Sequence, residues 1–384
     1  MDIAPTQATS LAISAPTDAL QAVVHADPAP YYAELAATRP FFFDAALGWW
    51  VAASAKAVDA VLGSAACRVR PADEPIPKAV AASPTGTFFG RLVRQIDGPD
   101  HGTRKAKVMA ALGRLDLSAL ADQARRQADA ALPDVAGLDA VLGTDAHFRV
   151  PLATIVQTLL GDRADAPACQ ADIAAYLAAL GPGASADAVA RADAAVGRLQ
   201  HRFADSPLTT SDDAAEISNL AALLAQTYDA CAGLLGNCIV ALSRHASLHA
   251  RLRTEPQAIE PFVREVLRRD APVQNTRRFV AQDVELLGQP LRAGDKILVL
   301  LAAANLDGTT NPDPLRFDID RVEPRLWTFG GGIHRCPADA LATTIARETV
   351  RHLLRLPTID AWLASLGDVA YRPSPNARIP DFHA

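Results

Sequence analysis

The sequence predicts a mainly α-helical protein with a small β region. Long segments rich in alanine and leucine carry apolar residues at helical spacing, most clearly at residues 120–132, 186–203 and 220–243. Strand-like runs are few and short, and the best of them lie at residues 277–280 and 296–301. We therefore expect helices to form the body of the protein and the strands to form one small sheet.

Proline and glycine cluster at residues 71–84, 181–183 and 312–314, which predicts loops within one unit rather than linkers between domains. The chain has 384 residues, of which 50% are hydrophobic and 21% charged, so it can bury a large core. This length suits one large helical unit that encloses a cofactor. We expect residues 1–30 to be a poorly defined N-terminal extension and residues 31–384 to form a single domain.

The charge balance argues against nucleic acid as a partner. The formal net charge is −6, and no block of lysine and arginine forms a basic stripe. The chain also lacks a basic segment followed by a long apolar core within residues 1–30, so we expect no signal peptide and no membrane anchor. An apolar stretch at residues 220–242 is interrupted by Gln226, Asp229 and Asn237, short of the ~20 apolar residues that span a bilayer. These features predict a cytoplasmic protein with a buried central helix and no membrane contact.

One of the cysteines lies in a distinctive segment. The chain has five cysteines, an odd number without CxxC spacing, which argues against a disulfide framework or a zinc knuckle. Cys336 ends the segment WTFGGGIHRC at residues 327–336, and Pro337 follows at a position suited to the first turn of a helix. A helix starting there, together with Arg335, should lower the thiol pKa and favour the thiolate, the form that binds metal. The alternative is an ordinary buried thiol in a glycine-rich turn.

The arrangement of Phe329, Gly332, His334 and Cys336 resembles the cysteine loop of the cytochrome P450 superfamily. The family usually has an aliphatic residue and then a glycine after the cysteine, where this chain has Pro337 and Ala338. The resemblance extends from about residue 31 to the C-terminus. It implies the P450 fold, a triangular helical heme-binding architecture of the bacterial, soluble type, with heme b as the cofactor and Cys336 as the axial ligand of its iron.

A second motif strengthens the resemblance. Glu265 and Arg268 match the family's ExxR pair, and at i, i+3 the two side chains share one face of a helix. Residues 311–318 (NPDPLRFD) resemble the segment that supplies the family's third member, which would be Arg316 here. The resemblance implies that these three residues form a buried network behind the heme, because buried charges persist only when they are paired.

Four further positions match family residues that contact the heme propionates. His101 matches a histidine of an early helix, Arg278 a strand arginine, and His334 a basic residue of the cysteine loop. Lys105 stands where an arginine is usual, so the charge is kept and the bidentate geometry is lost. We expect these four residues to bind the cofactor together with Phe329, Gly332 and Cys336.

The central helix departs from the family pattern. At the usual distance before the ExxR glutamate, the family has an acid followed by threonine or serine, whereas this chain has Asp229 followed by Ala230; Gln226 and Thr227 replace a pair of small residues. Activation of dioxygen needs protons at the outer oxygen, so the missing hydroxyl affects the mechanism. Our leading hypothesis is hydroxylation with Asp229 acting through ordered water, or with a substrate hydroxyl replacing the alcohol, and Thr227 as a local substitute. The alternative is a peroxygenase, or an enzyme for radical coupling or desaturation.

The substrate is expected to be a medium-sized hydrophobic small molecule of secondary metabolism, oxidised with O2. Candidate pocket residues are Phe88, Phe89, Tyr228 and Val273. The chain carries no dinucleotide fingerprint and no iron–sulfur cysteine set, so electrons should come from a ferredoxin or flavodoxin with its reductase, docking near Arg335. We expect a monomer. A heme protein that only binds or senses a small molecule remains the non-enzymatic alternative.

Overall fold

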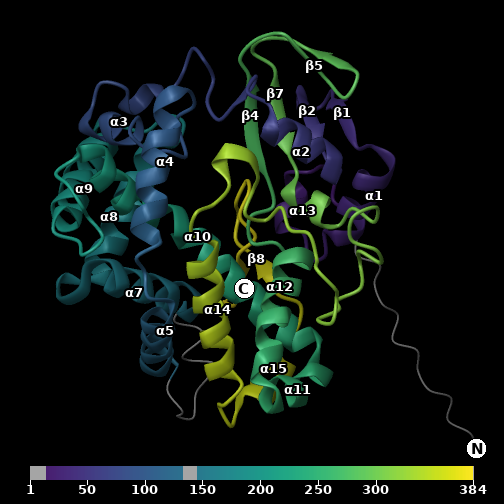
Figure 1. Cartoon of the computed structure of the whole chain (residues 1–384). Coiled ribbons are helices and arrows are strands. Elements are labelled where there is room, and N and C mark those ends of the chain that lie inside the picture. Colours follow the sequence, from purple (N-terminus) through teal and green to yellow (C-terminus); the bar gives the residue numbers. More distant parts are fainter. Residues whose placement is uncertain (1–13, 133–144, 384) are drawn as a thin grey trace, which may run out of the picture.

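The computed structural model describes residues 14–132 and 145–383. Its helices are α1 (Ala29–Thr38), α2 (Ala55–Gly63), α3 (Pro84–Phe89), α4 (Pro99–Leu112), α5 (Leu117–Ala131), α7 (Ala146–Leu160), α8 (Ala166–Ala179), α9 (Ala186–Ala204), α10 (Ala214–Arg244), α11 (His249–Thr254), α12 (Ile259–Arg269), α13 (Leu301–Asn305), α14 (Asp339–Leu353) and α15 (Ile359–Ser365). Its strands are β1 (Phe41–Asp44), β2 (Trp49–Ala52), β3 (Cys67–Arg68), β4 (Thr276–Val280), β5 (Val284–Leu286), β6 (Gln289–Leu291), β7 (Lys296–Val299), β8 (Ala370–Tyr371) and β9 (Pro380–Asp381). The predicted mainly α-helical fold with a small β region is confirmed (Figure 1).

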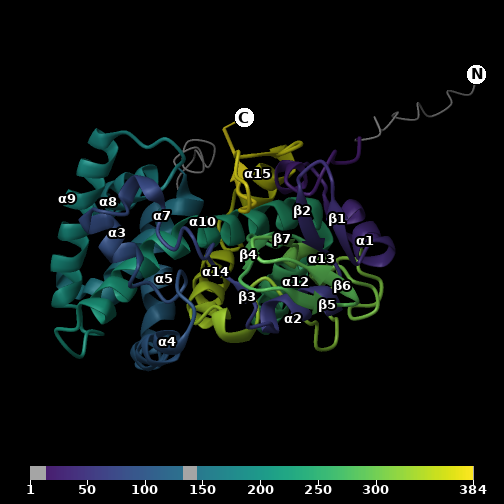
Figure 2. The ribbon, with the colours of Figure 1, turned by 90° about the horizontal axis from the view of Figure 1, so that it is seen from above.

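The largest sheet has the strand order β1-β2-β7-β4-β3. β2 pairs with β7 in parallel, and the other neighbours are antiparallel. The strands predicted at residues 277–280 and 296–301 correspond to β4 and β7. The second prediction is two residues too long, because Leu300 leaves the sheet and Leu301 begins α13. This sheet lies on one side of the molecule, with α3, α8 and α9 on the other (Figures 1 and 2).

α10 is the predicted central helix, and it passes through the middle of the molecule (Figure 2). It begins after Asp213, whose carboxylate accepts a hydrogen bond from the Ala215 N–H at 2.9 Å and caps the helix. Two glycines allow the C-terminal segment to pack directly on it: a Cβ atom at Gly233 would lie 2.8 Å from the Arg378 carbonyl oxygen, and one at Gly236 would lie 2.7 Å from Pro380 Cδ. The chain end is therefore held against the central helix.

The packed part of the chain begins before residue 31, the expected domain boundary. Arg378 is fully buried, and its guanidinium donates hydrogen bonds to the carbonyl oxygens of Val23 (3.1 Å), His25 (2.6 Å) and Ala26 (2.9 Å). These bonds satisfy a buried cation with backbone oxygens. They fasten the segment before α1 to the C-terminal strands, so residues from about Asp18 onward belong to the same body.

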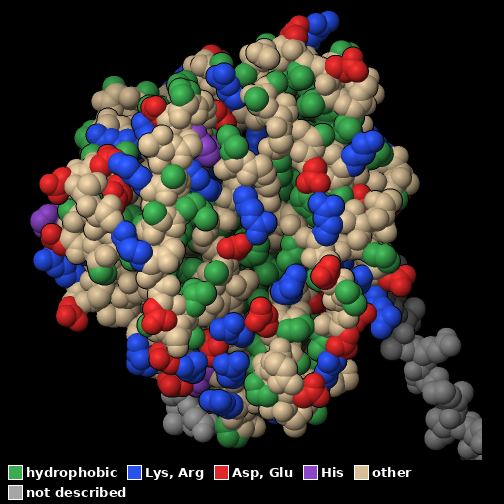
Figure 3. Space-filling view, in the orientation of Figure 1, with side chains coloured by type: hydrophobic (Ala, Val, Ile, Leu, Met, Phe, Trp, Pro, Cys, Tyr) green, Lys and Arg blue, Asp and Glu red, His purple; other side chains and the backbone are tan. Residues whose placement is uncertain are grey.

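Two features of the structure concern contact with a membrane and with charged partners. Among the described residues, no helix has both the length and the apolar character needed to cross a membrane. On the face that carries α12 and α14, acidic and basic side chains are interspersed without a broad basic area (Figure 3).

Candidate active site

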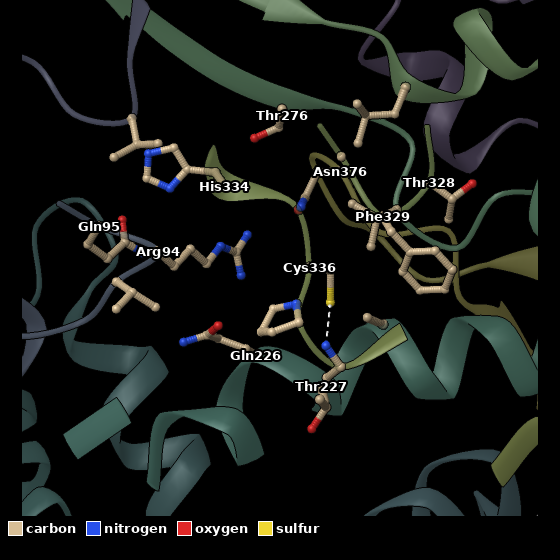
Figure 4. A pocket seen from close by; sticks show the side chains of 18 of the residues that line it. Arg94, Gln95, Gln226, Thr227, Thr276, Thr328, Phe329, His334, Cys336 and Asn376 are labelled. Atoms are coloured by element: carbon tan, nitrogen blue, oxygen red, sulfur yellow. Dashed lines mark hydrogen bonds between the residues drawn. The ribbon is translucent and has the colours of Figure 1, made fainter. Parts of the chain in front are cut away.

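A cavity of about 460 Å³ lies where α10, the cysteine loop (residues 327–338), β4 and the segment before α4 meet (Figure 4). Cys336 lines it, with Ala230 and Cys231 of α10 nearby in the lining and Asn376 contributed by the C-terminal segment. Much of the remaining wall is apolar. The contacts of the C-terminal segment with α10 described above complete this enclosure.

The cysteine loop is shaped by backbone hydrogen bonds and by glycines. The Cys336 N–H donates to the Phe329 carbonyl oxygen at 2.8 Å, which closes the loop. Gly330 and Gly332 both have positive φ angles, 69° and 60°, and a Cβ atom at Gly332 would lie 2.3 Å from the Leu62 carbonyl oxygen. Only glycine fits there without movement of α2. The loop thus fixes the position of Cys336 through its backbone.

The Cys336 thiol is held inside the protein, and its surroundings in the protein raise its pKa, whereas the sequence predicted a lowered pKa. Burial raises the pKa, and nearby Asp339 also acts to raise it. The Ala338 N–H, which donates to Sγ at 3.4 Å, and the charges of Lys105 and Arg94 act in the opposite direction. The contribution expected from Arg335 is missing, because its guanidinium pairs with Asp339 at 2.7 Å on the surface and α14 begins only at Asp339. A metal bound to the sulfur would reverse this balance, since coordination deprotonates a thiol.

Cationic groups gather at one edge of the cavity. Lys105, Arg278 and His334 all line it, from α4, β4 and the cysteine loop respectively. His334 Nε2 lies 2.9 Å from Asp97 Oδ1, and the His101 ring packs edge-on against the His334 ring at 4.5 Å. His101 does not line the cavity itself, yet its Nε2 is buried without a partner in the described residues. These donors are suited to bind an anionic group that lies in the cavity.

The predicted pair of Glu265 and Arg268 forms behind the cysteine loop. Arg268 Nε donates to Glu265 Oε2 at 2.8 Å and Arg268 Nη2 donates to Oε1 at 2.6 Å, with both side chains buried. The prediction that Arg316 completes the network through its side chain is wrong. That side chain is 69% exposed, and the Arg316 carbonyl oxygen instead accepts a hydrogen bond from Arg268 Nη2. The second cation beside Glu265 is Arg321, with Nε 3.5 Å from Oε2.

The comparisons with known proteins agree with this geometry. The family profile of cytochrome P450 matches residues 239–356, which include the Glu265–Arg268 pair and the cysteine loop. Cytochrome P450 107B1 of Saccharopolyspora erythraea is 29% identical over 308 residues, covering 74% of each chain. The cytochrome P450 monooxygenase PikC of Streptomyces venezuelae is 36% identical over 176 residues, 45% of this chain and 42% of PikC.

Solved structures give the same result over nearly the whole chain. The crystal structure of CalO2 is similar with a TM-score of 0.75 at 25% identity, covering 96% of both chains. The structure of P450BioI in complex with an acyl carrier protein ligated to hexadec-9Z-enoic acid has a TM-score of 0.75 at 20% identity, covering 92% of this chain and 96% of P450BioI. The chain belongs to the cytochrome P450 superfamily. It is therefore a heme-dependent monooxygenase that acts on a small molecule with O2 and electrons from a redox partner.

The cavity side of α10 in this P450 is unusual. Gln226, Thr227 and Ala230 line the cavity, whereas Asp229 does not and is exposed on another face of α10. The expected position of Asp229 at the cavity is thus wrong, because a residue next to Ala230 is rotated by about 100° around the helix axis. Thr227 is also poorly suited as a free hydroxyl, since its Oγ1 donates to the Leu223 carbonyl oxygen at 2.6 Å.

Three of the four predicted substrate contacts of this P450 lie outside the cavity. Val273 lines it, but Phe88 and Phe89 are buried in the helical core. The ring of Phe88 packs edge-on against Tyr176 at 5.4 Å. Tyr228 accepts a hydrogen bond from Gln170 Nε2 at 2.9 Å. Phe88 and Phe89 therefore belong to the core and not to the wall of the cavity.

Sequence reasoning also missed polar residues that the P450 cavity contains. They include Arg94 and Gln95, which precede α4, Asn376 near the C-terminus, and Gln226, which had been noted only as a departure from the family pattern. The one signal for Arg94 was its position just before the Asp97-Gly98-Pro99 start of α4, a helix already expected to face the cofactor.

Proposed function

We propose that this monooxygenase binds heme b through the sulfur of Cys336 and oxidises, most simply by hydroxylation, a medium-sized small molecule held in the cavity beside α10. The observation that carries the proposal is the position of the Cys336 thiol in a cavity with cationic groups at one edge and apolar residues elsewhere. A heme with a thiolate ligand supplies the activation of O2 and the transfer of one oxygen atom to the substrate.

The chain's own residues would hold this cofactor in two ways. Lys105, Arg278 and His334 would pair with its two carboxylates, and the unpartnered Nε2 of His101 could contribute a further hydrogen bond. The Ala338 N–H would stabilise negative charge on the sulfur, because it already donates to Sγ. The Glu265–Arg268 pair would keep the segment beneath the loop rigid, since Arg268 also donates to the Pro314 carbonyl oxygen at 2.7 Å.

Proton delivery is where the proposed reaction departs from the usual pattern. Ala230 has no hydroxyl, the Thr227 hydroxyl is bonded within the helix, and Asp229 does not line the cavity. Neither Asp229 nor Thr227 is therefore a strong candidate for a catalytic acid. We propose that water in the cavity or a polar group of the substrate takes this role. The same observation favours a second candidate function, a peroxygenase, for which a relay from solvent to dioxygen matters less.

Electrons would come from a separate ferredoxin or flavodoxin with its reductase. A concave surface beside the cysteine loop carries Arg264, Arg335 and Arg347 together with Glu260 and Asp339. Its arginines offer partners for an acidic electron carrier, and Cys336 lies just behind it. The monomeric state and the cytoplasmic location stay predictions.

The test of the proposal is the spectrum of the reduced protein with carbon monoxide. We expect the band that is diagnostic of a thiolate-ligated heme, and we expect Cys336→Ser to abolish it. Cys231→Ser is the matched control, because Cys231 lines the same cavity from α10 and should leave the band unchanged. A folded, heme-loaded protein without the band, or with a band that depends on Cys231, would refute the assignment.

The oxidant is tested separately. Product formation with NAD(P)H and a surrogate ferredoxin system, with little product from peroxide alone, would support the monooxygenase reaction. Rapid turnover with peroxide alone would support the peroxygenase instead.

A further inference from the structure

The cavity carries more positive charge than the proposed cofactor accounts for. Its lining includes the cationic side chains of Arg70, Arg94, Lys105, Arg277 and Arg278, and no aspartate or glutamate of the described residues lines it. A cavity of one charge sign, walled by apolar residues, concentrates ions of the opposite sign.

Four of the five cations have partners or assigned roles. Arg70 pairs with Glu74 at 3.6 Å, and Arg277 lies over the Trp49 ring at 5.3 Å. Lys105 and Arg278 are assigned above to the two carboxylates of the heme, with His334 as a third group. Arg94 is left without a counterpart.

Arg94 projects into the cavity, where Figure 4 shows its guanidinium aimed toward the space beside Cys336 and Gln226. Among the described residues it forms no hydrogen bond and no ion pair; only the charges of Cys336 and Tyr176 act on it at longer range. The Arg94 side chain has accessible surface because it faces the cavity, yet desolvation by the surrounding protein lowers its pKa. An enclosed cation without a partner is costly unless a ligand supplies the opposite charge.

Resting on the function proposed above, we infer that Arg94 binds a carboxylate of the substrate, so that the substrate is an amphiphilic acid with its apolar part among Val93, Leu223 and Val273. The guanidinium fork matches the two oxygens of a carboxylate. A carboxylate also matches the single free charge, whereas a phosphate dianion would leave one negative charge uncompensated. The side-chain amides of Gln95 and Gln226 lie on the same side of the cavity and can donate further hydrogen bonds (Figure 4). The sequence predicted a hydrophobic substrate, whereas the substrate inferred here is hydrophobic with one charged end that Arg94 binds.

The test uses two acids of different shape, decanoic acid and 4-phenylbutyric acid, each compared with its own amide. Binding to the ferric holoprotein is measured by the shift of the heme band and by calorimetry. We expect each acid to bind about tenfold to a hundredfold more tightly than its amide, the gain of a charge-assisted hydrogen bond. Decyl phosphate should bind less tightly than decanoic acid. Equal binding of acid and amide, absence of binding by all four compounds, or a preference for the phosphate would overturn the inference.

Variants assign the selectivity to Arg94. Arg94→Gln should bring the ratio of acid to amide affinity close to one, and Arg94→Lys should retain part of it. Arg70→Gln is the matched control, because it removes a cation that lines the same cavity but already pairs with Glu74, and the ratio should persist.

Two further readouts separate other roles of Arg94 from this one. If Arg94→Gln speeds the transfer of heme to apomyoglobin while the ratio persists, Arg94 holds the cofactor and the inference fails. If it shifts the carbon monoxide band while the ratio persists, Arg94 acts on the thiolate and the inference fails. Absence of the diagnostic band in the parent protein would sink the proposed function, whereas calorimetry on the folded chain would still measure the selectivity.

Discussion

The network around Glu265 makes a sharp prediction about which arginine completes it. Replacing Arg321 with Gln removes an ion pair to Glu265 at 3.5 Å and hydrogen bonds from its guanidinium to the carbonyl oxygens of Pro312 (2.5 Å) and Asp313 (3.1 Å). The Arg321 side chain is 11% exposed, so water replaces these partners only in part. We expect a loss of about 2–3 kcal/mol in the free energy of unfolding, from several hydrogen bonds and one largely buried ion pair.

The control is Arg316→Gln, because the Arg316 side chain is 69% exposed and only its backbone serves the network. That variant should change the free energy of unfolding by less than about 0.5 kcal/mol. Glu265→Gln should lower the free energy of unfolding by about 3–5 kcal/mol, since it leaves the Arg268 cation buried without the negative charge that pairs with it. Urea unfolding of the holoprotein, followed by circular dichroism and by the heme band, measures all three. A larger loss for Arg316→Gln than for Arg321→Gln would refute the reasoning.

Three further predictions concern the cysteine loop, a buried histidine and α10. Gly332→Ala should destabilise the protein by about 3 kcal/mol or more, since its Cβ atom would lie 2.3 Å from a carbonyl oxygen. Gly330→Ala has open space around its Cβ atom and should cost only about 1–2 kcal/mol, for its positive φ angle. Unfolding curves of the two variants test the difference. Burial lowers the pKa of His147 to about 4, so the unfolded chain binds a proton that the folded chain excludes, and stability should fall by up to about 3 kcal/mol as the pH drops from 6.5 to 4. His147→Phe should remove that part of the pH dependence, and an unchanged slope would contradict it. Ala230→Thr should raise the fraction of NAD(P)H consumption that is coupled to product, because it returns a hydroxyl to the cavity wall; unchanged coupling would show that another group delivers the protons.

The parts of the site that the sequence predicted well are those fixed by backbone geometry. Phe329, Gly332 and Cys336 form the loop as expected, because the positive φ angles and the approach to Leu62 admit only glycine at position 332. Glu265 and Arg268 meet because i, i+3 residues share one face of a helix. Local rules of spacing are sufficient in such cases.

The incorrect predictions depend on where an irregular segment directs its side chains. Arg316 and Arg321 lie on the same loop, and no spacing rule decides which one turns inward. Phe88 and Phe89 are conspicuous in sequence, but both are buried, and the ring of Phe88 packs against Tyr176 of α8, a residue far from it in the sequence. Arg94 went unnoticed because a single arginine before a helix has no periodic signal.

The rotation of α10 about its axis explains why this helix was predicted only in part. Its existence and burial followed from apolar composition, but its relation to the cavity depends on rotation about its axis. Gln226, Ala230 and Leu234 are spaced by four residues and face the cavity together, which directs Asp229 away from it. Asp229 is therefore kept in the sequence but does not line the cavity, whereas the polar groups that line it include the amide of Gln226 and the guanidinium of Arg94. A cavity lined by amides and cations, to which no described residue contributes an acid, is better suited to hold an anion than to pass protons along its own side chains.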